Sequence, residues 1–183
     1  MNREEALSFV RQKVSNRNLV NHMLAVEAIM RRLARHFGED EERWGLAGLL
    51  HDVDYEMTKD NPDQHSLVSG QMVAELGLDV EIVDAVKAHN ERHGLPRTTL
   101  ISKALYASDP LSGLIVAAAL IRPEKKLALV DTKFVLNRFG EKSFARGANR
   151  EIIKSCSEFG LDLEQFITLG IEAMQGIAAE IGL

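Results

Sequence analysis

Apolar residues recur at alternating intervals of four and three along the first part of the chain, and this spacing constrains the fold more than any other feature. Between residues 18 and 37 the apolar positions are Leu19, Met23, Val26, Met30, Leu33 and Phe37. This spacing places one apolar stripe on an α-helix, and Gly38 is a typical helix end. Such a stripe has to be buried against other elements, so the segment predicts a packed helical core.

Helical patterns continue along the chain, and strand patterns are nearly absent. We expect further helices over 40–51, 64–76, 79–89, 98–109, 112–121, 126–138, 149–159 and 162–181. A chain of 183 residues with 45% apolar composition is long enough to bury a sizeable core in one domain. The sequence therefore predicts an all-α fold, a compact single-domain helical bundle spanning residues 1–183.

The charge balance is acidic, with 22 Lys and Arg against 27 Asp and Glu and a net charge of −5. From this balance we expect no nucleic-acid partner and no binding to an anionic membrane surface. The longest apolar run, 114–121, is too short to span a bilayer, and the first residues lack the apolar region of a signal peptide. We therefore expect a cytoplasmic protein, and the single Cys156 excludes an internal disulfide.

Four histidines and two aspartates form an ordered series at or beside the apolar helix faces. The series is His22, the pair His51-Asp52, His65, His89 and Asp109, of which His65 opens its predicted helix. Taken singly, each residue has an ordinary interpretation as a hydrogen-bonded core histidine or a helix-terminal carboxylate. Burying several such groups on converging helices is costly unless they satisfy one another, and a divalent metal ion would do this. The series therefore predicts a metal site.

This H…HD…H…H…D series on helices resembles the HD superfamily of metal-dependent phosphohydrolases over about residues 18–111, with 112–183 as a helical C-terminal extension. The resemblance implies that one ion is bound by His22, His51, Asp52 and Asp109. In branches with a second ion, it implies that His65 and His89 bind it and that Asp52 bridges both. Because nitrogen and oxygen ligands suit several metals, we expect one or two divalent ions among Fe, Mn, Zn, Co and Ni.

The chain also departs from the family pattern. Many relatives read His-Asp-Ile-Gly where this chain has Val53-Asp54 after the His-Asp pair, and the Gly-Tyr-Pro signature of the cyclic-dinucleotide branch is missing, which argues against that substrate. Asp54 is either a general base or acceptor beside the metal, or a carboxylate in the loop after the helix. The resemblance implies that Lys103, within LISKALYASD, contacts a substrate phosphate. Further candidates for phosphate contacts, each alternatively a solvated surface charge, are Arg97, Lys142, Arg146 and Arg150.

The function expected from these residues is metal-dependent hydrolysis of a phosphate ester or anhydride. The expected substrate is a nucleotide or another small phosphorylated metabolite, and the catalytic candidates are Asp52, Lys103 and Asp54. Divalent ions would lower the pKa of a water molecule and neutralise charge on the phosphoryl oxygens. Two alternatives remain open: a non-catalytic metal-containing binding or regulatory module, and a di-iron oxygenase, since some HD relatives use the same six ligands to activate oxygen.

Overall fold

The computed structural model describes residues 1–183, and every regular element in it is a helix. The α-helices are α1 (Arg3–Lys13), α2 (Arg17–Phe37), α3 (Glu41–Leu50), α4 (Tyr55–Thr58), α5 (Leu67–Glu75), α6 (Val80–Ala88), α7 (Leu100–Leu120), α8 (Thr132–Phe139), α9 (Arg150–Lys154), α10 (Leu163–Gln175) and α11 (Ala178–Ile181). Three short 3-10 helices are η1 (Glu91–His93), η2 (Leu127–Leu129) and η3 (Ser155–Phe159). The predicted all-α fold class is confirmed. None of the helices is both long enough and apolar enough to span a bilayer.

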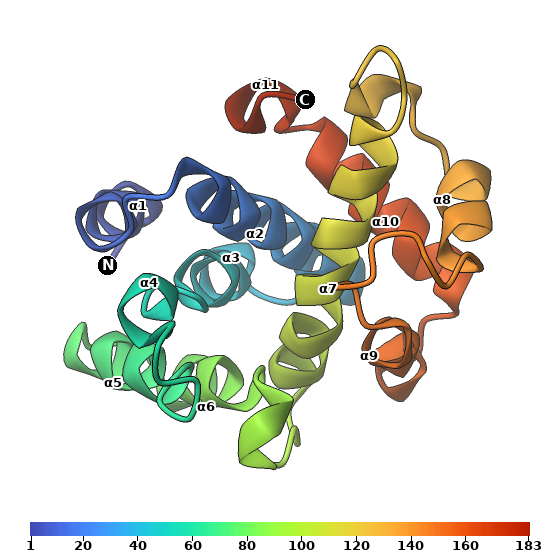
Figure 1. The fold of residues 1–183 in the computed structure, drawn as a ribbon. Coiled ribbons are helices and arrows are strands. Elements are labelled where there is room, and N and C mark those ends of the chain that lie inside the picture. Colours follow the sequence, from blue (N-terminus) through green and yellow to red (C-terminus); the bar gives the residue numbers. More distant parts are fainter.

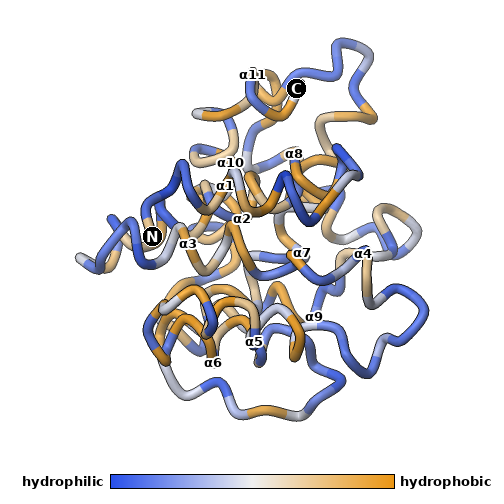
Figure 2. Tube along the Cα trace, turned by 90° about the vertical axis from the view of Figure 1, so that its left-hand side faces the viewer, coloured by the Kyte–Doolittle hydropathy of each residue, from blue (hydrophilic) through white to orange (hydrophobic).

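Helix α7 runs through the middle of the molecule, with α3 to α6 on one side of it and α8 and α9 on the other (Figure 1). A single hydrophobic cluster of 47 buried residues, extending from Ala6 to Ile181, joins the two sides. The hydropathy colouring shows apolar segments on the packed helices α5 and α6, whereas the outer connecting loops are mostly hydrophilic (Figure 2). The core therefore surrounds α7 and includes residues from both ends of the chain.

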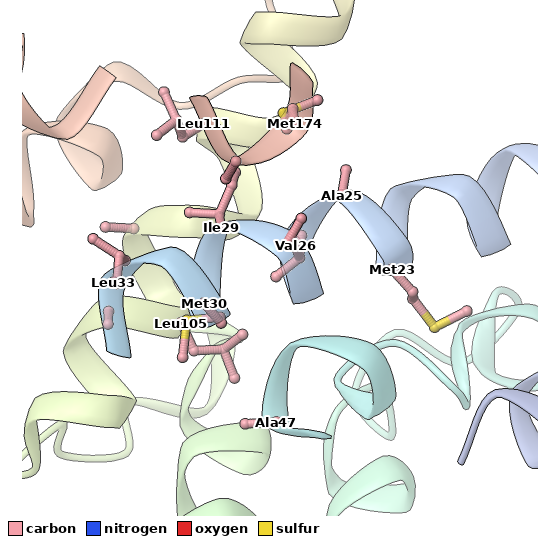
Figure 3. Packing of buried hydrophobic residues seen from close by; sticks show 14 of the residues in the cluster. Met23, Ala25, Val26, Ile29, Met30, Leu33, Ala47, Leu105, Leu111 and Met174 are labelled. Carbon is pink, nitrogen blue, oxygen red and sulfur yellow. The ribbon is translucent and has the colours of Figure 1, made fainter. Parts of the chain in front are cut away.

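Helix α2 has the boundaries that its apolar stripe predicts. The Asn16 side chain accepts a hydrogen bond from the Asn18 backbone at its start, and Gly38 ends it in the left-handed conformation with φ 72°. Ile29 lies toward Leu111 and the C-terminal helix α10, whereas neighbouring side chains of α2 point toward α3 (Figure 3). Because α2 is packed on both flanks, it fixes the position of the residues on its exposed edge.

Helices α2 and α3 approach each other closely enough that their backbones touch at Gly48. A Cβ atom added at Gly48 would lie 2.8 Å from the Cα of Glu27 and 2.9 Å from the Val26 carbonyl oxygen, closer than real Cβ contacts. Only glycine fits there without moving a backbone. His51 follows one turn later as the C-terminal cap of α3, so this close approach sets its position.

The structure differs from the predicted helices at Pro110. One helix was expected before this residue, over 98–109, and another after it, over 112–121. The structure instead has a single helix, α7, that contains Pro110. Proline lacks the N–H that would donate to the carbonyl of Tyr106, four residues earlier, and this loss normally ends or kinks a helix. Here the residues on both sides of Pro110 are held by burial, since Ala107, Ser108 and Leu111 are buried in the core, and tertiary packing outweighs the missing bond.

Three predicted helices in the C-terminal third are interrupted. Residues 126–138 contain η2 and then α8, separated by extended Val130 and the N-terminal cap Asp131. Residues 149–159 divide into α9 and η3, and residues 162–181 divide into α10 and α11 around Ile177. In the first of these segments the Asp131 side chain caps a new helix by accepting from the Phe134 backbone, whereas the starts of η3 and α11 have no side-chain cap.

Candidate metal centre

The structure brings all six residues of the His/Asp series together at one place. His22 lies on α2, His51 caps the end of α3 and Asp52 follows it. His65 lies in the turn before α5, His89 caps the end of α6, and Asp109 lies in the middle of α7. Five segments that are distant in sequence thus contribute to one cluster, and all but the turn that carries His65 were expected from apolar helix faces.

The Asp52 carboxylate lies at the centre of this cluster. Its Oδ1 atom is 3.2 Å from Nε2 of His89, 3.4 Å from Nε2 of His65 and 3.6 Å from Nε2 of His51. Nε2 of His22 lies 3.7 Å from the other oxygen, Oδ2, and 3.2 Å from Oδ1 of Asp109. Asp52 therefore faces three imidazoles with one oxygen and the fourth with the other.

Each of the four histidines forms a hydrogen bond through Nδ1 to an acceptor outside the cluster. Two of these acceptors are backbone carbonyls: Nδ1 of His51 lies 2.8 Å from the Gly48 oxygen and Nδ1 of His89 lies 2.6 Å from the Val86 oxygen. Nδ1 of His65 lies 2.9 Å from Oδ1 of Asp54. Because acceptors of this kind require a proton on Nδ1, each of these rings can present an unprotonated Nε2 to the interior.

His22 also has a hydrogen-bond acceptor at Nδ1, and this acceptor is the hydroxyl of Ser112. Its Nδ1 lies 3.0 Å from the Ser112 hydroxyl, and that hydroxyl donates its own proton to the Asp109 carbonyl at 2.8 Å. The Ser112 oxygen is therefore left to accept from His22 Nδ1. Inward Nε2 atoms with outward Nδ1 hydrogen bonds are the usual arrangement of metal-binding histidines.

The polar atoms at the centre of the cluster fit a divalent ion. Nε2 of His51 is buried without any hydrogen-bond partner, which is costly in a protein interior. Ligand atoms lie within 4.8 Å of one another in two overlapping groups, His22 with His51 and Asp109, and His51 with Asp52 and His89. Imidazole and carboxylate in this number are the ligands of Zn, Mn, Fe and related ions.

Burial and neighbouring charges shift the pKa values of these groups in different directions. Burial lowers the pKa of His51 to about 4, so this ring is neutral at physiological pH. Burial also disfavours the charged form of Asp52, but the surrounding histidines hold its pKa far below the usual value. Burial lowers the pKa of His89, yet the Asp52 carboxylate outweighs this and raises it to about 9. His89 is therefore protonated in the metal-free cluster at neutral pH.

Asp54 is fully buried behind His65 and does not line the cleft. Besides Nδ1 of His65, it accepts hydrogen bonds from the backbone N–H groups of Ser66 at 2.8 Å and Ser69 at 2.9 Å. Ser66 has a φ of 72°, rare for a residue with a side chain, and its hydroxyl donates to the Lys87 carbonyl. This geometry fits the interpretation of Asp54 as an acceptor that orients His65, and it gives the carboxylate no free oxygen with which to act as a base.

The cluster opens into a cleft of about 560 Å³. The cleft is lined by Asn16, Asn18, Leu19, His22, Asp52, Tyr55, Glu56, Lys59, His65 and Asp109. Lys59 is the only lysine or arginine among them, and Tyr55 presents its ring edge-on to His65 with the centroids 5.1 Å apart. The mouth of the cleft therefore offers one free cation and one exposed aromatic ring beside the buried ligands.

The predicted phosphate contacts lie elsewhere. Nζ of Lys103 is 3.5 Å from the Glu158 carbonyl, and Lys103 does not line the cleft. Arg97 stacks on the Tyr106 ring at 3.7 Å and donates to a backbone carbonyl. Arg150 donates to several backbone carbonyls around 138–148, so its guanidinium holds that loop together. The two remaining candidates, Lys142 and Arg146, are exposed and form no ion pair.

Sequence reasoning missed Ser112, Lys59 and Tyr55. Ser112 follows Asp109 by three residues on α7, so helical spacing from a predicted ligand was a usable signal for it. Lys59 and Tyr55 lie in the polar stretch between the His-Asp pair and His65, where no periodicity exists. Only the tertiary fold reveals that this stretch forms the mouth of the cleft.

An all-α bundle that gathers four histidines and two aspartates in an open cleft defines a helical protein with a candidate metal centre. The family model for the HD domain matches residues 19–120, more than half of this chain. The chain therefore belongs to the HD-domain family. Membership implies binding of divalent metal, and the cluster is compatible with it.

Several curated relatives carry the name ribonuclease Y. The protein of that name from Lawsonia intracellularis is 29% identical over 145 residues, which cover 74% of this chain and 26% of that protein. The one from Pelobacter propionicus is 27% identical over 167 residues, covering 90% of this chain and 32% of that protein. The chain thus spans between about a quarter and a third of the length of these relatives. No solved structure matches this chain.

These relatives contradict the expected partners, which were a small phosphorylated substrate and no nucleic acid. A ribonuclease by its name acts on RNA, and similar sequences therefore belong to proteins with a nucleic-acid substrate. The physical reason for the error is that net charge averages over the whole chain. Nucleic acid responds to local charge, and an acidic total does not exclude a basic surface.

Proposed function

We propose that this chain is a metal-dependent phosphodiesterase that hydrolyses RNA. The observation that carries the proposal is the inward convergence of four imidazole Nε2 atoms and two carboxylates in a cleft open to solvent. The similarity to proteins named ribonuclease Y supports RNA as the substrate class. A structural metal site would be expected to be closed, whereas this one has a cleft with room for a ligand.

The division of ligands between two ions follows the HD-family pattern. His22, His51 and Asp109 would hold one ion and His65 and His89 the other, and Asp52, which faces all four histidines, would contribute to both. When bound, divalent ions supply an activated water and neutralise charge on the phosphoryl oxygens. Asp54, Ser112 and the helix-end carbonyls keep the imidazoles in the orientation that this requires.

Lys59 and Tyr55 give the chain's own contacts to an RNA strand. The ammonium group of Lys59 at the mouth of the cleft would attract and position a phosphate. The ring of Tyr55, about half exposed, offers a surface on which a base can stack. The metal ligands themselves are then free to act on the scissile phosphate.

A local excess of positive charge also favours RNA. Residues 122–150 contain eight Lys and Arg against three Asp and Glu, a net charge of +5 in a chain whose total is −5. Within this segment Lys142 and Arg146 are exposed and form no ion pair. Phosphate backbones bind to such clusters regardless of sequence, so this segment offers a second attachment point for a polymer.

The test is cleavage of a fluorescent single-stranded RNA oligonucleotide by protein loaded with Mn²⁺, Co²⁺, Ni²⁺, Zn²⁺ or Fe²⁺. We expect cleavage with at least one of these ions and a loss of about 100-fold or more in the His22→Ala variant. His36→Ala is the matched control, because His36 lies on the same helix but is exposed and outside the cluster. Intact RNA under every ion, or equal loss in both variants, would overturn the proposal.

A further inference from the structure

A second cavity of about 440 Å³ adjoins the metal cleft. It shares His22 and Asn18 with the cleft and extends from there between α2, α7 and the segment after α11. Its volume lies within the range of small-molecule binding sites. A ligand with a phosphate at the metal cluster can therefore extend past His22 into this cavity.

One wall of the second cavity is apolar. It is formed by Val116 and Leu120 of α7 and by Ile181 and Leu183 near the C-terminal end of the chain. Leu120 is 49% exposed, so part of its side chain is accessible at this wall. Aliphatic side chains in this arrangement provide a dry surface against which a flat ring can pack.

The opposite side of the cavity carries two amide side chains from α2. Asn21 donates through Nδ2 to the Ile181 carbonyl at 3.1 Å, which leaves its Oδ1 without a partner. The side-chain amide of Asn18 forms no hydrogen bond within the protein. Free amide donors and acceptors beside an apolar surface match a planar heterocycle that has both donors and acceptors on its edge.

Gly113 lines the second cavity, and the space beside it is open. It follows Asp109 by one helical turn on α7, and a Cβ atom added there would meet no atom within 4 Å. A larger side chain at this position would enter the cavity without disturbing a packed neighbour. The position therefore allows the cavity to be filled while the fold is kept.

From these observations we propose that the second cavity seats the nucleobase next to the scissile phosphate. Val116 and Leu120 contact the face of the base, and the amides of Asn18 and Asn21 contact its edge. This inference rests on the proposed function, and it makes a base-free phosphodiester a poorer substrate than a nucleotide. It also predicts that the enzyme distinguishes among the four bases at this position, because an amide pair does not match every base edge equally.

The test uses the four nucleoside 5′-monophosphates as ligands and the four-base set of RNA dinucleotides as substrates. Binding to Zn²⁺-loaded protein is measured by calorimetry, and kcat/KM is measured for each dinucleotide. We expect the dissociation constant to rise at least tenfold in Gly113→Phe and much less in Gly113→Ala. Asn18→Ala loses no hydrogen bond of the folded protein, and we expect it to change the order of preference among bases.

The outcomes separate the inference from the function on which it rests. If monophosphates bind and Gly113→Phe weakens them, the base site stands even where no RNA is cleaved. If RNA is cleaved with the same kcat/KM for all four bases and neither variant changes binding, the base site is wrong while the hydrolase remains. Thermal unfolding of Gly113→Phe and its metal content show that a loss of binding does not come from a loss of fold.

Discussion

At the scale of single residues, the cluster depends on the hydrogen bond that each histidine forms through Nδ1, the ring nitrogen that faces away from the centre of the cluster. Two rings donate to carbonyls at helix ends, one to Asp54 and one to Ser112. Four different acceptors thus produce the same result, an imidazole that points Nε2 inward. The ends of α3 and α6 provide these carbonyls because the last carbonyls of a helix have no partner within it.

The raised pKa of His89 makes metal binding depend on pH. Asp52 holds the pKa of His89 at about 9 in the metal-free protein, above the usual 6.5. This proton therefore stabilises the metal-free fold below about pH 6.5, and its contribution is lost as the pH rises through about 9. We expect Zn²⁺ binding to release a proton from this group at pH 7 to 8 and the apparent affinity to rise toward pH 9. Calorimetry in buffers of different ionisation enthalpy measures both, and a pH-independent affinity with no proton release would contradict the assignment.

The two lysines considered for phosphate binding give a matched pair of variants. Lys59 lines the cleft, whereas Lys103 lies near the Glu158 carbonyl outside it. We expect Lys59→Ala to lower kcat/KM for RNA about tenfold, through the loss of one charge-assisted contact of about 1.5 kcal/mol. Lys103→Ala should stay within about twofold of the unaltered protein. The reverse order would restore Lys103 as the phosphate contact and remove Lys59.

Four residues of the cluster could be placed from sequence by helical spacing from buried apolar residues: His22, His51, His89 and Asp109. Asp52 follows His51 directly. His65 could not be placed this way, since it precedes α5 in a turn fixed by Ser66 at positive φ and by the carboxylate of Asp54. Lys103 was assigned by resemblance alone, and a family pattern does not report where a long exposed side chain points.

At the scale of helices, the site depends on how closely α2 and α3 approach. Gly48 permits the contact with the Glu27 backbone, and its carbonyl also accepts from Nδ1 of His51. One residue thus connects helix packing to ligand orientation. Sequence could predict both helices and the N-terminal cap of α3 at Asp40, but the distance between two helices is a property of the pair. The same limit explains Pro110, where packing on α7 overrides a local signal to stop.

Two glycine-to-alanine variants test this packing. Gly48→Ala forces a Cβ atom against the backbone of α2, and we expect it to lower the free energy of unfolding by about 1–3 kcal/mol. Gly113→Ala adds the same atom to open space on α7, where we expect a gain of about 0.5–1 kcal/mol from helix propensity. Urea unfolding of both metal-free variants measures the difference. Equal stability of the two would show that α2 and α3 are not in backbone contact.

At the scale of the whole molecule, the cluster brings together side chains from parts of the chain that are distant in sequence. Its residues come from α2, α7, the ends of α3 and α6 and the turn before α5, so an ion bound by them would link the N-terminal helices to the central one. The uneven distribution of charge also belongs to this scale. The acidic total concealed a basic segment at 122–150, so composition alone did not justify the expectation of no nucleic-acid partner.

Because the ligands span the fold, removing metal should destabilise it. At an ion concentration of about 100 times the dissociation constant, bound metal adds about 2.7 kcal/mol, which for a chain of this size raises the Tm by roughly 5–10 °C. We expect excess chelator to remove this increment from the unaltered protein and to have little effect on His22→Ala. A chelator shift of the same size in both proteins would mean that the stabilising ion binds elsewhere.

The metal content of the purified protein tests the central claim most directly. Elemental analysis after saturation with Mn²⁺ or Zn²⁺ and removal of the excess should give about two ions per chain in the unaltered protein. The His65→Ala/His89→Ala variant should retain about one, because His22, His51, Asp52 and Asp109 are intact. No bound ion in the unaltered protein, or the same number in both, would contradict the two-ion centre on which the proposed hydrolysis depends.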